Sequence, residues 1–156
     1  MSKATRYGMI NRLFCYGTLM APPLFTRISG VPASIEAATL LDYQRFQMKS
    51  RAYPGIVSCA GAEVQGCLYH GVGTGPLARL DQYEGDWYKR KLVTVRGAGN
   101  KMVKAWCYVV QNIHAHKVGA DDWCLDAFVE KHLRQTLAQL SFRNEDGVMP
   151  AQRILE

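Results

Sequence analysis

Short apolar runs separated by polar turns occupy the first two thirds of the chain. Their lengths, and the alternation of apolar with polar side chains, predict β-strands. We expect these strands over residues 10–16, 33–41, 45–49, 63–71, 88–95 and 102–110, with a turn at residues 42–44. A glycine-rich turn at residues 96–100 joins the last two strands and indicates an antiparallel hairpin.

Three other segments carry apolar residues at helical spacing. Residues 22–29 begin with two prolines, which suit the first turn of a helix, and residues 76–84 begin with a proline and end before Gly85. The longest segment, about residues 121–141, opens with Asp121 and Asp122, where the helix dipole favours acids. Its apolar face would comprise Leu125, Phe128, Val129, Leu133, Leu137 and Leu140.

Many short, consecutive strands with few helices are typical of an α+β domain built on a twisted sheet or a small barrel. We expect one domain over residues 1–156, with its core at about residues 10–111, the C-terminal helix at about 121–141 and a mixed tail at 142–156.

The composition agrees with one globular domain, because 48% of the 156 residues are apolar and 21% are charged. No apolar run reaches the length of a membrane span, and residues 1–11 lack the features of a signal peptide. The five cysteines are scattered without CxxC spacing. We therefore expect a reduced, cytoplasmic setting and no membrane partner.

The net charge of +6 and the pI of about 9.2 suggest nucleic acid as one possible partner. The basic residues are dispersed, however, and the densest group is only Lys89, Arg90 and Lys91. An anionic small substrate or a solvated surface explains the charge as well, so nucleic acid is not the partner we expect. Binding through charge alone would give strongly salt-dependent retention on DNA or RNA.

A first candidate site follows the first predicted strand, at Tyr16, Gly17, Thr18 and Leu19. A strand that turns through glycine and threonine into a helix start leaves several backbone N–H groups pointing the same way. Such a cradle can bind a carboxylate or a phosphate. Taken alone, the same residues also describe an ordinary strand-to-helix corner.

Glu84 is the second candidate, because its position in the 76–84 helix is unusual for a carboxylate. At about 100° per residue from Leu77, Leu80 lies near −60° and Glu84 near −20°, so Glu84 shares their apolar face. Burial raises the pKa of a carboxyl group, and a raised pKa suits a general base and acid near neutral pH. The alternatives are that the helix end turns Glu84 outward, or that it pairs with Lys89, Arg90 or Lys91.

Several short motifs occur in an order that resembles the γ-glutamylcyclotransferase-like superfamily, in the small-domain branch that includes γ-glutamylamine cyclotransferase. The resemblance covers about residues 13–110. The residues that carry it are Tyr16, Gly17, Thr18 and Leu19; Tyr53, Pro54, Gly55 and Ile56; Val64, Gly66, Leu68 and Tyr69; Leu80, Asp81, Tyr83, Glu84, Gly85, Tyr88 and Arg90; and Val93 and Val95.

The resemblance implies a small, mixed but mainly antiparallel β-barrel flanked by helices. It also implies an enzyme that cyclises a γ-glutamyl amine or peptide to 5-oxoproline and needs no cofactor. The loop of Tyr16, Gly17, Thr18 and Leu19 would bind the α-carboxylate, and Glu84 would be the general acid and base. Tyr88 would line the pocket with its hydroxyl, unless it packs inward as an ordinary strand aromatic. The leaving group stays open, because residues 85–88 form a compact segment where several relatives differ.

Other residues with reactive side chains have simpler interpretations. Strand alternation places Cys15 opposite Phe14 and Tyr16, which disfavours a Cys–His hydrolase. His132 is expected to be a packed histidine. Asp81 shares the face of Glu84, and two carboxylates could divide the acid and base roles, but an aspartate there more often caps a helix or pairs with a cation. The residue types of Cys107, His114 and His116 suit a metal, but no fourth ligand is defined, so we predict no metal site.

The main rival in function is a non-catalytic module of the same fold that binds an acidic metabolite or a protein terminus. Either a monomer or a homodimer is compatible with the sequence. Turnover of a γ-glutamyl compound, and its loss in Glu84→Gln, would separate the enzyme from the binding module.

Overall fold

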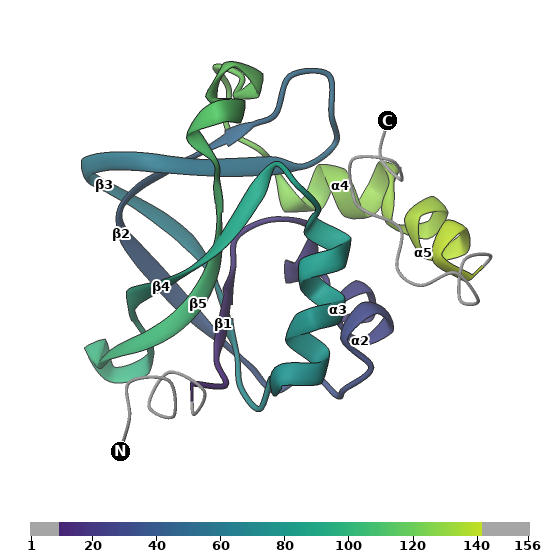
Figure 1. The fold of residues 1–156 in the computed structure, drawn as a ribbon, viewed down its shortest axis with the longest axis horizontal. Helices are drawn as coiled ribbons and strands as arrows, with labels where there is room; N and C mark the ends of the chain where they lie inside the picture. The colour runs from purple at the N-terminus through teal and green to yellow at the C-terminus, as the bar shows by residue number, and fades with distance from the viewer. Residues whose placement is uncertain (1–9, 142–156) are drawn as a thin grey trace.

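The computed structural model describes residues 10–141 and shows a closed five-stranded barrel with helices packed beside it (Figure 1). The strands are β1 (Leu13–Cys15), β2 (Ile35–Gln47), β3 (Pro54–Tyr69), β4 (Tyr88–Arg96) and β5 (Met102–Val110). They follow the order β1-β3-β2-β4-β5, and β1 closes the barrel by pairing parallel to β5 while the other pairs are antiparallel. The predicted α+β class and mixed, mainly antiparallel barrel are confirmed.

The helices are α2 (Pro22–Ser29), α3 (Thr74–Glu84), α4 (Leu125–Lys131) and α5 (Leu133–Ser141), with short 3-10 turns η1 (Thr18–Met20), η2 (Ala98–Asn100) and η3 (Asn112–Lys117). In Figure 1 the four α-helices gather on the same side of the barrel. Helix α2 has the predicted bounds, and α3 begins two residues before Pro76. None of the helices within residues 10–141 is long and apolar enough to cross a membrane.

Alternation along the strands divides the core into two clusters. Phe14 and Tyr16 belong to a cluster with strand residues such as Leu40, Ile56 and Leu68, which fills the barrel. Their neighbours Leu13 and Cys15 belong to a second cluster that includes side chains of α2 and α3 and joins the helices to the barrel. The predicted opposition of Cys15 to Phe14 and Tyr16 is therefore confirmed.

The turn predicted at residues 42–44 is wrong, because β2 runs unbroken through it. Asp42 adopts a φ of 64°, and the register with β3 shifts between Leu41 and Tyr43, which is a β-bulge. The Asp42 carboxylate accepts the Gly61 N–H at 3.0 Å. Asp42, a residue type typical of turns, thus bends a long strand instead of ending it. The next strand, β3, is also longer than predicted, because it begins at Pro54 and not near residue 63.

The single C-terminal helix predicted at residues 121–141 is also wrong. The Asp122 carboxylate accepts hydrogen bonds from Arg45 and from the Trp123 N–H, and α4 begins only at Leu125. The helix breaks at His132, whose carbonyl accepts the Thr136 hydroxyl at 2.8 Å, a side-chain bond that bends helices. Val129, expected on the apolar face, is 43% exposed. The predicted tail at 142–156 lies outside the described residues.

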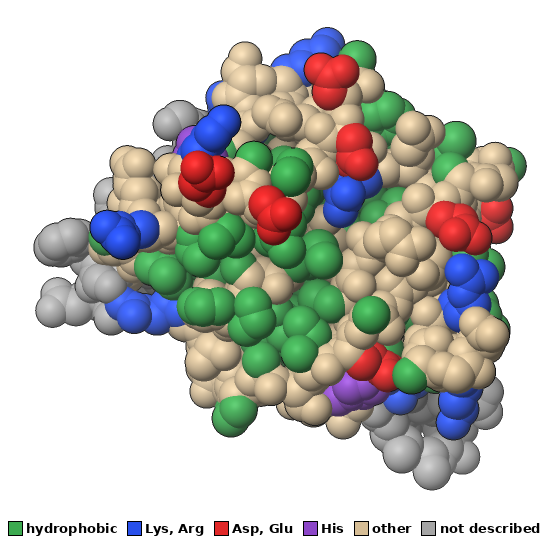
Figure 2. All heavy atoms as spheres, turned by 180° about the vertical axis from the view of Figure 1, so that it is seen from behind, with side chains coloured by type: hydrophobic (Ala, Val, Ile, Leu, Met, Phe, Trp, Pro, Cys, Tyr) green, Lys and Arg blue, Asp and Glu red, His purple; other side chains and the backbone are tan. Residues whose placement is uncertain are grey.

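Charged side chains on the back of the molecule are scattered singly. In Figure 2 lysines and arginines alternate with acidic side chains around a group of hydrophobic ones. No continuous basic surface is visible on this face.

Candidate active site

A pocket lies where β1 leaves the barrel, and the residues singled out in the sequence surround it. Tyr16, Gly17, Thr18 and Leu19 line it together with Glu84 and Tyr88, although about 65 residues separate the loop from the glutamate. The remaining lining residues are Phe14, Cys15, Tyr53, Pro54 and Tyr108. Two segments distant in the sequence thus form the walls of one cavity.

The loop after β1 is fixed by hydrogen bonds from three other elements. Arg45 of β2 donates to the Tyr16 carbonyl at 2.9 Å, and Tyr69 of β3 donates from its hydroxyl to the Leu19 carbonyl at 2.6 Å. The Thr18 and Tyr83 hydroxyls lie 2.9 Å apart and form a buried hydrogen bond. Because η1 starts directly after Gly17, the first N–H groups of this turn have no acceptor within the turn itself.

Glu84 occupies the last turn of α3, where Leu77, Leu80 and Tyr83 are buried. The Glu84 residue is half-buried and lines the pocket, so the helix end does not turn it away from the cavity. Gly85, with a φ of 77°, ends the helix immediately afterwards. Glu84 therefore lies on the same face of α3 as Leu77 and Leu80, as the sequence indicated, and this face points to the pocket.

The pKa of the Glu84 carboxyl is raised from 4.5 to about 8, first by burial and then by the negative charge of Asp81. Arg90, one of the alternative partners considered for Glu84, instead pairs with Asp81 at 2.8 Å from Nε to Oδ1. Tyr108 also donates to Asp81 Oδ1, at 2.6 Å. Asp81 is thus ion-paired, which is one of the roles that the sequence suggested for it.

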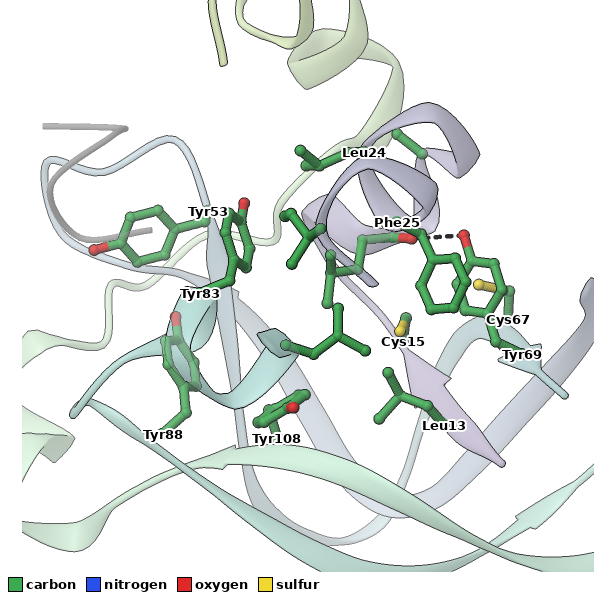
Figure 3. Close-up of a cluster of buried hydrophobic side chains, with 14 of the residues drawn as sticks. Leu13, Cys15, Leu24, Phe25, Tyr53, Cys67, Tyr69, Tyr83, Tyr88 and Tyr108 are labelled. Atoms are coloured by element: carbon green, nitrogen blue, oxygen red, sulfur yellow. Dashed lines mark hydrogen bonds between the residues drawn. The ribbon is translucent and has the colours of Figure 1, made fainter. Parts of the chain in front are cut away.

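Three tyrosines that line the pocket, Tyr53, Tyr88 and Tyr108, and Tyr83, which is hydrogen-bonded to the pocket residue Thr18, come from separate elements of the fold (Figure 3). Tyr53 precedes β3, Tyr83 lies in α3, Tyr88 begins β4 and Tyr108 lies in β5. Burial raises the pKa of Tyr88 well above 10, and the charge of Glu84 raises it further, so this phenol stays neutral. The Tyr88 hydroxyl donates to the Pro54 carbonyl at 2.7 Å and thereby fixes the pocket wall.

Cys15 lines the pocket, but its surroundings disfavour a nucleophile. Burial and the nearby Cys67 thiol raise the pKa of Cys15 well above its ordinary value, so the reactive thiolate is not populated near neutral pH. Among the described lining residues there is no histidine to activate it. The Cys–His hydrolase considered from the sequence therefore lacks its base.

The chain matches a known protein family over the residues that form this pocket. The family described as "Gamma-glutamyl cyclotransferase, AIG2-like" matches residues 13–125, which include every residue that lines the pocket. The chain belongs to this family. The superfamily resemblance carried by the sequence motifs is thereby confirmed.

Several Arabidopsis thaliana proteins are relatives within the AIG2-like family. AIG2-like protein A is 35% identical over 86 residues, and this match covers 55% of the chain and 52% of the relative. AIG2-like protein B is 26% identical over 126 residues, covering 80% and 73%. The chain thus spans about half the length of the first relative and about three quarters of the second.

Solved structures share the fold of this AIG2-like domain. The solution structure of an A. thaliana protein has a TM-score of 0.65 at 27% identity and covers 86% of this chain and 81% of its own. A crystal structure of an AIG2-like protein from Mus musculus has a TM-score of 0.60 at 17% identity, covering 74% and 88%. A structure titled "Gamma-glutamyl cyclotransferase" has a TM-score of 0.57 at 20% identity, covering 65% and 66%.

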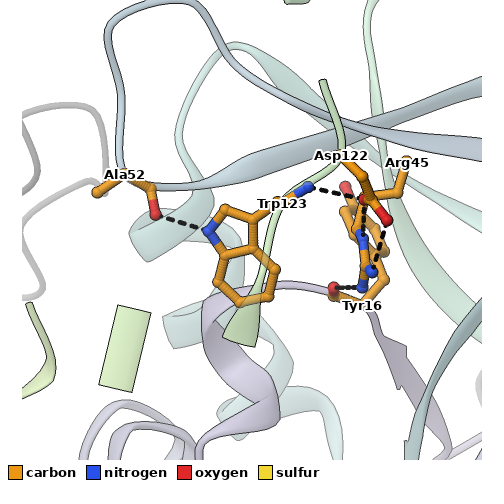
Figure 4. Close-up of polar contacts among 5 residues, drawn as sticks. All are labelled: Tyr16, Arg45, Ala52, Asp122 and Trp123. Atoms are coloured by element: carbon orange, nitrogen blue, oxygen red, sulfur yellow. Dashed lines mark hydrogen bonds and ion pairs between the residues drawn. The ribbon is translucent and has the colours of Figure 1, made fainter. Parts of the chain in front are cut away.

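The supports around the AIG2-like pocket were not foreseen from the sequence. Arg45 donates both to the Tyr16 carbonyl and to the Asp122 carboxylate, and the neighbouring Trp123 donates from its indole to the Ala52 carbonyl at 2.8 Å (Figure 4). The segment after η3 therefore ties together the loops on two sides of the pocket. No local pattern indicates these contacts, since Arg45 and Asp122 are 77 positions apart.

We predict that Gly17→Ala weakens both the fold and ligand binding, because a Cβ at Gly17 would lie 2.8 Å from Pro54 Cγ. Separating the loop from Pro54 should lower the free energy of unfolding by about 1–3 kcal/mol. Chemical denaturation and calorimetric titration with a γ-glutamyl ligand measure both effects. Gly73→Ala is the matched control, because a Cβ there meets nothing within 4 Å. Equal stability and affinity in the two variants would contradict the role of this close packing.

Proposed function

We propose that the protein is a γ-glutamylcyclotransferase, which converts a γ-glutamyl amine or peptide into 5-oxoproline and releases the amine. The observation that carries the proposal is a carboxyl group with a pKa near 8, Glu84, in the same pocket as the loop at Tyr16–Leu19. Membership of the family agrees with this chemistry.

The loop supplies the proposed binding site for the substrate α-carboxylate. Backbone N–H groups at the start of a helical turn are suitable donors to an anion. The hydrogen bonds to the Tyr16 and Leu19 carbonyls hold this backbone before a substrate arrives. A preformed loop of this kind would fix one end of the γ-glutamyl group and orient the rest.

Glu84 carries the proposed proton transfers. Its carboxylate removes a proton from the substrate α-ammonium, and the freed amine attacks the γ-carbonyl carbon. The new C–N bond closes a five-membered lactam, and the C–N bond to the leaving amine breaks as Glu84 returns the proton to that nitrogen. The ring nitrogen then passes its second hydrogen, through Glu84, to the released amine. Of the three ammonium hydrogens, one thus stays on the lactam nitrogen and two leave on the amine, which departs as an ammonium, and Glu84 is again ionised.

A pKa near 8 suits both directions of this transfer. At pH 7 about one tenth of the Glu84 carboxyls would be ionised and able to act as the base. Once protonated, the group is a stable acid for the departing amine. The attack is intramolecular, so holding the substrate folded contributes much of the rate.

The test is to incubate the purified protein with a panel of γ-glutamyl peptides and amines and to quantify 5-oxoproline and free amine. The proposal expects equal amounts of both products from at least one member of the panel. If calorimetry detects ligand binding while every member remains intact, the protein is a binding module of the same fold.

A further inference from the structure

Arg45 links the Tyr16 loop to the segment before α4, and the chemistry above does not use it. Its Nη1 donates to the Tyr16 carbonyl at 2.9 Å, while its Nε and Nη2 donate to the two carboxylate oxygens of Asp122 at 2.8 and 3.3 Å (Figure 4). All three nitrogens of the guanidinium are therefore engaged. One edge of the fork holds the carboxylate, and the remaining nitrogen holds the loop.

Asp122 sets the orientation of this guanidinium, and Asp122 is itself fixed. Its Oδ1 also accepts the Trp123 N–H at 2.7 Å, and the Trp123 ring centre lies 5.7 Å from Arg45 Cζ. The hydrogen bonds from Arg45 lower the pKa of Asp122, so the carboxylate stays ionised near neutral pH. The planar fork of arginine thus rests on a planar carboxylate, an arrangement that lysine cannot reproduce.

Backbone pairing brings Asp122 to the strand that carries Arg45. The Gly119 N–H donates to the Gln47 carbonyl at 2.8 Å, and the Gln47 N–H donates to the Asp121 carbonyl at 2.7 Å. A Cβ at Gly119 would lie 2.5 Å from the Gln47 carbonyl oxygen, so this close approach requires glycine. The segment therefore adds to the end of β2 and places Asp122 beside Arg45.

The Tyr16 carbonyl belongs to the same peptide group as the Gly17 N–H, and both residues line the pocket. A charged donor on the carbonyl of a peptide polarises the group and makes its N–H a stronger donor. The Tyr16 hydroxyl donates to the Tyr108 carbonyl at 2.6 Å, so the side chain of this residue is fixed as well. Arg45 is not among the described residues that line the pocket, so it would act on a ligand through this peptide.

We propose that Arg45, held by Asp122, is a positioning residue for the substrate α-carboxylate. It fixes the direction of the Tyr16–Gly17 peptide and strengthens the Gly17 N–H as a donor to the anion. The inference rests on the proposed function, which assigns the α-carboxylate to this loop. Because Asp122 balances its charge, Arg45 contributes through the direction and polarity of one peptide group and not as a free cation.

The product of the proposed reaction tests carboxylate binding without any turnover. 5-Oxoproline carries the α-carboxylate, and 5-oxoprolinamide is a neutral molecule of nearly the same shape. NMR titration of isotope-labelled protein with each compound gives both dissociation constants and follows the Gly17 amide directly. The wild type should bind the acid about tenfold more tightly than the amide, because a charge-assisted hydrogen bond is stronger than a neutral one.

Arg45→Gln and Arg45→Lys should each weaken the binding of 5-oxoproline by about fivefold and leave that of 5-oxoprolinamide within about twofold. Lysine keeps the charge but cannot hold the carboxylate and the carbonyl together, so it should not restore the preference. Lys101→Gln is the matched control for loss of one positive charge, and it should bind both compounds like the wild type. Lys101 is exposed in the β4–β5 turn, at the opposite end of β4 from the pocket residue Tyr88.

Asp122→Asn separates positioning from charge. If Asp122 orients Arg45, its loss should weaken the binding of 5-oxoproline by about threefold or more, since a bidentate contact is replaced by a poorer one. If Arg45 acted as a cation alone, removing the negative charge would instead tighten it. The Asp122 side chain is 66% exposed, so this variant decides the matter even if the Arg45 variants fail to fold.

The outcomes separate this inference from the proposed function. Equal weakening of both compounds, no weakening, or tighter binding of the acid in Asp122→Asn would overturn the positioning role. A wild type that does not prefer the acid would overturn it as well. None of these results depends on turnover of the γ-glutamyl panel. A protein that cyclises nothing but shows the preference that depends on Arg45 would keep the positioning role and lose the cyclotransferase.

Discussion

Glu84→Gln is expected to lower kcat for 5-oxoproline release by about 10³-fold or more, because a positioned general acid and base contributes on the order of 10²–10⁴. Glutamine keeps the shape of the side chain but neither accepts nor returns a proton under these conditions. The α-carboxylate would still bind at the Tyr16–Leu19 loop. Substrate affinity should therefore change far less than the rate.

Single-turnover kinetics, with 5-oxoproline quantified by chromatography, measure the rate. Calorimetric titration of the same preparation measures the substrate affinity. Glu130→Gln is the matched control, since Glu130 is exposed on α4 and should retain wild-type turnover. Undiminished turnover in Glu84→Gln would remove Glu84 from the mechanism.

The same substitution is expected to stabilise the protein at alkaline pH. The pKa of Glu84 is raised in the folded state, from 4.5 to about 8, so folding favours the protonated carboxyl. Its contribution to stability is complete below pH 4.5 and is lost as the pH rises through 8. Glutamine stays neutral, so at pH 9 the variant should be more stable by roughly 2–4 kcal/mol. At pH 5 the two proteins should be nearly equal.

Thermal unfolding at pH 5 and pH 9 measures this difference. A gain of roughly 2–4 kcal/mol corresponds to roughly 5–10 °C in a domain of this size. Glu130→Gln should show no gain at either pH. An unchanged midpoint for Glu84→Gln at pH 9 would mean that burial does not perturb the Glu84 carboxyl.

Local sequence patterns were sufficient to predict the elements that are held by contacts between residues close in the sequence. The bounds of α2 follow from its prolines and the glycine after it, and the β4–β5 hairpin from its glycine-rich turn. The 3.6-residue period placed Glu84 with Leu77 and Leu80, and the structure places it at the pocket. Both halves of the candidate site were therefore visible in the sequence, although their catalytic and binding roles stay predictions.

Long-range contacts decided what the sequence patterns missed. Asp42 would end a short strand, but pairing with β3 on both sides of it converts the turn into a bulge. Asp122 would begin a helix, but its carboxylate accepts a hydrogen bond from Arg45, which is 77 residues away. Tyr53, Pro54 and Tyr108 were not predicted to line the pocket, because closure of the barrel is what brings these residues to its mouth.

The account depends most on Glu84 as the group that moves the proton, and the pH dependence of kcat/KM tests this directly. Measured from pH 5 to pH 9 on a substrate that the protein cyclises, the rate should rise tenfold per pH unit and level off with an apparent pKa near 8. That value is the raised pKa of the Glu84 carboxyl. A rate that is already level above pH 6 would contradict the account, because the base would then have an ordinary pKa.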